Sequence, residues 1–257
     1  MAPPSAERYQ PWPGIAALVI VLATLAVYAN SWAVPFTFDD QAAIVHNASI
    51  RHLGDLGAVL SPPGSGLTVD GRPVLNLSLA VNYAISGTQS WSYHALNIVI
   101  HAFAALTLFG IVRRTLLRAR EPGAAGASGT RFDAMEANAL AFAVALLWAV
   151  HPLQTESVTY VIQRAESLMG LFYLLTLYGF VRGVDAATTG TSSGWFGLSC
   201  LACLFGMGTK EVMVSAPLIV LLFDRTFVSA GLRAALSRRW RYYVTLALTT
   251  GVLLVLA

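Results

Sequence analysis

Long apolar stretches separated by short polar segments are the dominant pattern of this chain. The first stretch, residues 14–33, has 20 residues without a charge. As a helix it is about 30 Å long, the thickness of a bilayer core. Six such stretches predict membrane-spanning helices, and a seventh begins near Tyr242. The predicted spans are residues 14–33, 93–112, 137–150, 168–181, 195–209 and 212–223.

The composition supports an integral membrane protein, because 56% of the residues are hydrophobic and only 11% are charged. We therefore predict an all-α, polytopic membrane helix bundle with about six to seven spans. Residues 1–13 form a cytoplasmic N-terminus and residues 14–257 the transmembrane domain. Residues 34–92 form a long external loop, in which spaced apolar residues predict interfacial helices, one of them starting at Pro73. The Gly/Ala/Ser-rich residues 121–130 predict a linker.

The distribution of basic residues predicts the orientation. With Arg8 in the cytoplasm, 12 of the 16 basic residues lie on the cytoplasmic side, where the positive-inside rule places them. One cytoplasmic loop then holds Arg113, Arg114, Arg118, Arg120 and Arg131. Three polar segments then fall on the opposite face: the Asp39–Asp40 loop, residues 151–164 and the Lys210–Glu211 turn. The net charge of +3 follows from this topology and gives no reason to expect nucleic acid as a partner.

The choice of basic residues favours a bacterial inner membrane protein, whose active face would be periplasmic. Among the basic residues only Lys210 is a lysine, a bias typical of GC-rich genomes. In such a protein the sequons at Asn47 and Asn76 are accidental. Cys200 and Cys203 lie inside an apolar segment, where we expect packing residues rather than a redox or metal pair.

The polar segments supply candidate chemistry. Asp39 and Asp40 follow the first span directly, and unpaired carboxylates near a bilayer need partners, a metal or a catalytic role. Arg72 immediately precedes the predicted helix start at Pro73, and arginine is a usual partner of phosphate. In residues 151–164, a helix would place Glu156, Gln163 and Arg164 on similar faces.

The ordered combination of these motifs resembles the transmembrane and tetratricopeptide-repeat-containing O-mannosyltransferases, and the resemblance covers nearly the whole chain. The membrane half of this family is similar to other glycosyltransferases of the C superfamily. The matching motifs are Phe38-Asp39-Asp40, Asn47, Gly71-Arg72-Pro73-Val74-Leu75, Leu79, Asn82-Tyr83, Tyr93-His94-Ala95-Leu96-Asn97, His101, His151-Pro152, Thr155-Glu156-Ser157-Val158, Arg164-Ala165-Glu166, Lys210-Glu211 and Asp224.

This resemblance implies a glycosyltransferase-like membrane domain that moves a sugar, mannose in the first instance, from a polyprenyl-phosphate carrier to a hydroxyl of a protein or glycan outside the cytoplasm. Asp39 and Asp40 match the acidic motif that holds the base. We expect Asp39 as base and Asp40 as its orienter or a metal ligand, and the opposite order stays open. A divalent cation on this pair is left open, as is metal dependence itself. The donor phosphate would bind Arg72, Arg164 and Lys210. The groups that position these cations would be His94, His151, Glu156, Glu166 and Glu211.

Three alternatives stay open at this point. A related transferase could modify a lipid or a surface glycan with another sugar. A secondary transporter would use the charges as an ion path, although transporters place such charges near the midplane. A membrane anchor would only display a downstream repeat domain. The apolar residues 242–257 stop without a boundary signal, so we read the chain as a fragment that tetratricopeptide repeats would follow.

Overall fold

The computed structural model describes residues 12–62, 64, 67–118 and 132–253. The described residues form helices and connecting segments without any β-strand, so the all-α prediction is confirmed. The predicted linker at residues 121–130 and the N-terminal residues 1–11 lie outside the described part. The ten α-helices of this part are α1 (Trp12–Val27), α2 (Leu56–Leu60), α3 (Pro73–Ser86), α4 (Trp91–Arg118), α5 (Ala134–Ala149), α6 (Thr155–Thr159), α7 (Arg164–Asp185), α8 (Thr189–Met207), α9 (Ala216–Phe227) and α10 (Leu232–Leu248).

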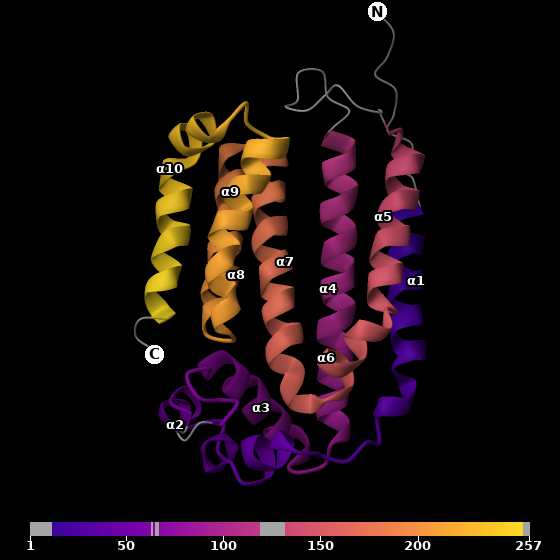
Figure 1. Cartoon of the computed structure of the whole chain (residues 1–257), viewed down its shortest axis with the longest axis vertical. Coiled ribbons are helices and arrows are strands. Elements are labelled where there is room, and N and C mark those ends of the chain that lie inside the picture. Colours follow the sequence, from indigo (N-terminus) through magenta and orange to yellow (C-terminus); the bar gives the residue numbers. More distant parts are fainter. Residues whose placement is uncertain (1–11, 63, 65–66, 119–131, 254–257) are drawn as a thin grey trace, which may run out of the picture.

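The long helices stand side by side as a bundle, and α2 and α3 lie across one of its ends (Figure 1). Helices α4 and α7 occupy the middle, where α4 packs against α1, α5 and α7, and α7 packs against α8. Close approach of α7 to α8 depends on Gly179, because a Cβ there would lie 3.0 Å from the α8 backbone. Small residues at such crossings let membrane helices pack closely.

The number of helices that could span a membrane is smaller than the sequence predicted. Three described segments are long and apolar enough: Trp12–Ser31, Trp91–Arg118 and Val161–Asp185. A fourth is possible if Ala134–Ala149 and Pro152–Thr159, which meet at 51°, form one bent span. The prediction of six to seven spans is therefore wrong by this criterion, while a polytopic helix bundle is supported.

Three further segments that the sequence predicted as spans became α8, α9 and α10. Each misses the length or hydropathy of a membrane span for its own physical reason. Helix α8 begins in a Thr/Gly/Ser-rich turn, which lowers its hydropathy. Helix α9 has 12 residues and is about 18 Å long, well short of a bilayer core. The first half of α10 is rich in arginine and kinks at Arg239.

The segment between α1 and α4 forms the compact layer at the end of the bundle that carries α2 and α3. Helix α3 begins at Pro73, as predicted. Asn47 and Asn76 are buried and joined by an Nδ2–Oδ1 hydrogen bond of 3.0 Å. Asn76 also donates to the carbonyl of Val59 at 2.7 Å. The two sequon asparagines therefore hold this layer together and are not accessible for glycosylation in the folded chain.

Candidate functional site

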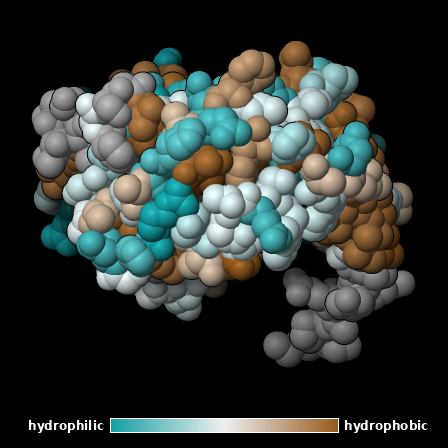
Figure 2. All heavy atoms as spheres, turned by 90° about the horizontal axis from the view of Figure 1, so that it is seen from below, coloured by the Kyte–Doolittle hydropathy of each residue, from teal (hydrophilic) through white to brown (hydrophobic). Residues whose placement is uncertain are grey.

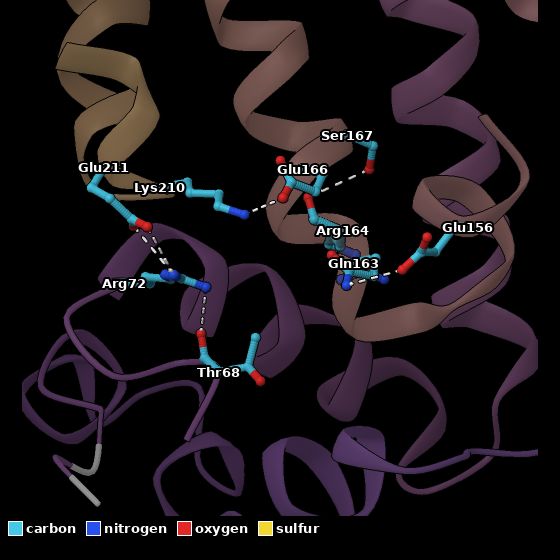
Figure 3. A network of polar contacts seen from close by, with 9 residues as sticks. All are labelled: Thr68, Arg72, Glu156, Gln163, Arg164, Glu166, Ser167, Lys210 and Glu211. Atoms are coloured by element: carbon cyan, nitrogen blue, oxygen red, sulfur yellow. Dashed lines mark hydrogen bonds and ion pairs between the residues drawn. The ribbon is translucent and has the colours of Figure 1, made fainter. Parts of the chain in front are cut away.

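The polar segments that the sequence places on one side come together at one end of the bundle. The start of α3, the start of α7 and the connection after α8 meet there (Figures 1 and 3). This end carries many hydrophilic side chains interspersed with hydrophobic ones (Figure 2). The convergence follows from topology, because α3 and α7 begin at the end where α8 finishes.

The two adjacent aspartates occupy opposite environments. Asp40 is 1% exposed, whereas Asp39 is exposed. Phe38, just before them, has a φ of 43°, in the left-handed region that a bulky aromatic residue rarely adopts. Strain of this kind persists where surrounding contacts impose it, often at functional sites.

Asp40 fastens the loop to the segment that leads into α7. Its Oδ1 accepts the backbone N–H of Ile162 at 2.9 Å and its Oδ2 accepts that of Thr37 at 3.1 Å. Burial raises the pKa of Asp40, and the two backbone hydrogen bonds act in the opposite direction. Because both oxygens have donors within the chain, Asp40 is suited to position its neighbour.

Asp39 keeps a carboxylate that is open to solvent. Its backbone N–H donates to the Tyr160 hydroxyl at 3.0 Å, which fixes the main chain. At the side chain, Thr68 Oγ1 lies 3.5 Å from Oδ2, the outer limit of a hydrogen bond. No other described residue donates to this carboxylate. An exposed, weakly engaged carboxylate on a fixed backbone can accept a proton from a bound hydroxyl.

Two cation–carboxylate pairs lie beside each other at the same end (Figure 3). Arg72 Nη2 is 3.2 Å from Glu211 Oε2, and its Nη1 donates to the Thr68 carbonyl at 3.0 Å. Lys210 pairs with Glu166. Glu211 has a lowered pKa, mainly through a hydrogen bond from its own backbone N–H, with further contributions from Arg72 and Lys210. The sequence neighbours Lys210 and Glu211 thus connect α7 with the start of α3.

The start of α3 is joined to the end of α8 through the backbone. The N–H of Val74 donates to the carbonyl of Gly208 at 2.9 Å. A Cβ at Gly208 would lie 2.8 Å from Val74 Cγ2, so the chains approach closely here. This contact sets how Arg72 lies relative to Lys210.

Arg164 does not join this cluster. It is 0% exposed, and its guanidinium donates to protein oxygens only. Nε binds Asn97 Oδ1 at 2.6 Å, Nη1 binds Asn82 Oδ1 at 2.7 Å, and Nη2 binds the Tyr93 carbonyl at 2.9 Å. A continuous helix that would place Arg164 on the face of Glu156 does not form, because the backbone is extended at Tyr160. Arg164 therefore points into the core and ties α7 to α3 and α4.

The remaining predicted residues occupy different places. Glu156 is exposed and accepts from Gln163 Nε2 at 3.5 Å, so it contacts an amide and no cation. His151 is exposed, and its Nδ1 accepts the N–H of Leu153, which makes it a cap for the following turn. His94 is 1% exposed, with Nε2 2.9 Å from the Val34 carbonyl. Of the five positioning candidates, Glu166 and Glu211 contact the expected cations.

A hollow of about 240 Å³ adjoins the Lys210–Glu166 pair. It opens between α6 and the start of α7, so it is part of the same end face. Two carboxylates are among its lining residues. Its lining residues are Leu153, Glu156, Ser157, Gln163 and Glu166.

The described residues do not form an evident metal centre. No three side chains among His, Cys, Asp and Glu of the described part come together as a ligand set. Each oxygen of Asp40 already accepts one backbone N–H, from Ile162 and from Thr37. We therefore derive no step through a metal ion.

Sequence reasoning missed Tyr160 and Thr68, and it named Asn82 and Asn97 among the matching motifs without recognising them as partners of Arg164. The signal for the asparagines was present, because Asn82 and Asn97 are amides in otherwise apolar helices. Such side chains need buried partners. Tyr160 and Thr68 had no comparable signal.

Comparison with known proteins gives relatives of one kind. The chain is 32% identical over 229 residues to "Protein O-mannosyl-transferase TMTC2" of Mus musculus and of Homo sapiens, which covers 82% of this chain and 24% of the relative. It is 28% identical over 222 residues to "Protein O-mannosyl-transferase Tmtc3" of Drosophila melanogaster, covering 80% of this chain and 24% of the relative. No family model and no solved structure matches the chain.

The chain thus spans about a quarter of the length of these curated relatives. The match extends over four fifths of the residues of this chain. It recurs across several relatives whose names state the same activity. The chain is a homologue of the TMTC protein O-mannosyl-transferases, and the family resemblance of its motifs is confirmed.

Proposed function

We propose that this chain is the catalytic membrane part of a glycosyltransferase that moves mannose from a polyprenyl-phosphate carrier to a Ser or Thr hydroxyl of a protein. The names of the relatives support mannose and a protein acceptor. The observation that carries the proposal is the exposed Asp39 carboxylate on a backbone fixed by Tyr160, with Asp40 locked beside it. Thr68 connects this site to the cations, because its Oγ1 lies 3.5 Å from the Asp39 carboxylate and its carbonyl accepts from Arg72.

The proposed reaction is a direct displacement at the anomeric carbon. The acceptor hydroxyl oxygen forms the new bond to C1 while the bond from C1 to the phosphate oxygen breaks, and the configuration inverts. The hydroxyl proton passes to the Asp39 carboxylate. The bonding electrons leave with the polyprenyl phosphate, whose charge rises from about −1 to about −2 at neutral pH. A base on one side and cations on the other are the groups this displacement needs.

Arg72 and Lys210 are the cations that we assign to the phosphate. The Arg72 side chain is 21% exposed, while its partner Glu211 is 64% exposed. Exposed ion pairs contribute only about 0–1 kcal/mol, so the carboxylate can turn to water when a phosphate arrives. The growing charge on the leaving phosphate then strengthens the interaction in the transition state. We assign no phosphate contact to Arg164, because its donors are occupied in the core.

The proposal also includes the membrane and the side of it on which the candidate site lies. The donor is lipid-borne, and the three candidate membrane spans would hold the chain in the bilayer where that donor resides. We place the candidate site on the non-cytoplasmic face, the periplasm of a bacterium, because most basic residues then lie inside. Residues 14–257 form the transferase-like domain, and the N-terminus is cytoplasmic.

Transfer of labelled mannose from polyprenyl-phosphate-mannose to protein, in membranes that carry the full protein, tests the function. We expect Asp39→Asn to lower transfer about 10²–10⁴-fold, the usual contribution of a general base. Asp55→Asn is the matched control: it makes the same change in the same loop, and asparagine still caps α2 as Asp55 does. Retained transfer by Asp39→Asn would remove Asp39 as the base.

The same assay separates the alternatives. Polyprenyl-phosphate-glucose as donor tests the choice of sugar, and label in lipid or glycan would indicate a related transferase with another acceptor. Absence of any Asp39-dependent transfer from either donor would contradict an enzymatic role and favour transport or anchoring.

A further inference from the structure

A hollow of about 330 Å³ lies at the opposite end of the bundle, where α4 and α7 finish. It is separate from the candidate catalytic site, which lies at the start of α7. Three arginines and a single carboxylate line it, together with one leucine side chain. The lining residues are Arg113, Arg114, Leu117, Arg118 and Asp185.

The charges in this hollow do not cancel. Asp185 accepts from Arg114 at 3.0 Å and also pairs with Arg118. Arg113 uses its Nε on Asn138 Oδ1 at 2.6 Å, a neutral partner. One carboxylate among three guanidinium groups leaves a surplus of about two positive charges. The hollow therefore favours an anion.

Several donors in this hollow are without an acceptor in the described part of the chain. Arg118 Nε is buried and has no hydrogen-bond partner there. The terminal nitrogens of Arg113 likewise make no hydrogen bond to a described residue, since only its Nε is engaged. Buried donors without partners are costly, and guanidinium groups bind phosphate oxygens with matching geometry.

The level of the hollow relative to the bilayer identifies the source of the anion. Arg118 is the last residue of the candidate span Trp91–Arg118, and Asp185 is the last residue of Val161–Asp185. The hollow thus lies where two spans leave the hydrocarbon core, at the level of lipid headgroups. Arginines that only anchor a helix reach separately into the headgroup layer. Here three of them converge on one hollow.

We propose that this hollow binds the phosphate group of an anionic membrane phospholipid. The terminal nitrogens of Arg113 and the Nε of Arg118 are the free donors, while Arg114 and the Nη2 of Arg118 hold Asp185 aside. The apolar surface of Leu117 lies beside the headgroup. A bound lipid would join the ends of α4 and α7 on the face opposite to the proposed chemistry.

Native mass spectrometry of the full protein, titrated with short-chain phosphatidylglycerol, tests this site. We expect one saturable lipid that binds more tightly than phosphatidylcholine of the same chain length. The double variant Arg113→Gln/Arg118→Gln should weaken it about tenfold or more, as expected for lost charge-assisted hydrogen bonds. Arg238→Gln, which removes an exposed arginine of α10, should leave it unchanged.

Three controls make the outcome decisive. Arg113→Lys/Arg118→Lys keeps the charge, so partial retention supports a phosphate site that also needs the guanidinium fork. Competition by millimolar inorganic phosphate would assign the hollow to a soluble phosphate instead of a lipid. Equal binding of both lipids, or equal loss in Arg238→Gln, would overturn the proposal. An unchanged unfolding temperature of the glutamine variant establishes that a loss is not a folding defect.

Discussion

Arg72 and Arg164 are both arginines at helix starts, but the structure separates their roles. Arg164 has no exposed surface and donates to oxygens of α3 and α4. Arg72 lies at the surface beside Glu211. A charge is kept in the core only where its donors are satisfied, and here amides and carbonyls do this in place of a carboxylate. A carrier phosphate could reach Arg72 without disturbing the core, which is not true of Arg164.

Replacing each arginine by glutamine should therefore affect different properties, stability for Arg164 and mannose transfer for Arg72. We expect Arg164→Gln to lower the free energy of unfolding by about 3 kcal/mol or more, because Asn82, Asn97 and the Tyr93 carbonyl lose their donor. Arg72→Gln should change it by about 1 kcal/mol at most while lowering mannose transfer. Unfolding midpoints in detergent and transfer rates measure the two effects. Equal midpoints for both variants would contradict the structural role of Arg164.

Asp39 and Asp40 also differ as single residues, one exposed and one buried, and the sequence could not show which would be which. Both residues follow the same span and have the same chemistry. What distinguishes them is that Asp40 meets the N–H of Ile162, which lies far away in sequence. This contact depends on how the segment before α7 packs against the loop after α1. The residues around Asp39 and Asp40 therefore cannot predict it.

At the scale of elements, the contact between the start of α3 and the end of α8 decides whether the two cations lie together. Gly208 permits it, since a side chain there would meet the branched Val74. We expect Gly208→Ala to shift α3 away from α8 and lower mannose transfer, with a rise in KM for the donor because the phosphate contacts are spread apart. Steady-state kinetics with varied donor measure this effect.

Gly197→Ala is the matched control within α8. A Cβ at Gly197 meets nothing within 4 Å, and alanine favours a helix interior by about 0.5–1 kcal/mol over glycine. It should retain transfer and slightly raise stability. Unchanged kinetics in Gly208→Ala would show that the α3–α8 contact does not position the cations.

The sequence predicted some elements well and others poorly, for physical reasons. The apolar stretches that became α1 and α4 are long, so composition alone identified them, whereas the stretch 168–181 located only the core of α7. Helix α3 was predictable because proline fits the first helical turn. The short turns of residues 152–163 were missed, since tertiary contacts such as Ile162 with Asp40 decide where a helix breaks. The count of spans failed because apolar stretches that pack in a bundle need not each cross a membrane.

At the scale of the whole molecule, polar chemistry is divided between two ends. One end holds Arg72 and Lys210 (Figure 3), with Asp39 near them through Thr68, and the arginine-lined hollow lies at the other end, where α4 and α7 finish. The sequence predicted this division from alternating spans and the positive-inside rule. It placed Arg113, Arg114 and Arg118 in a loop, whereas they lie in the last turns of α4. The apolar pattern continues into these turns too weakly for sequence to locate the helix end.

If the bundle spans the membrane as proposed, its two ends face opposite compartments. Phe38 is 86% exposed and follows α1, whereas Arg238 lies in the arginine-rich first half of α10. The end of α1 and the start of α10 lie at opposite ends of the bundle (Figure 1). We expect a cysteine at position 38 (Phe38→Cys) to react with a membrane-impermeant maleimide in intact cells. Arg238→Cys should react only after lysis. The parent chain is the control, because its cysteines lie within α8, away from both ends. Labelling of both positions from the same side would contradict the two-ended arrangement and remove the basis for placing the sugar transfer outside the cytoplasm.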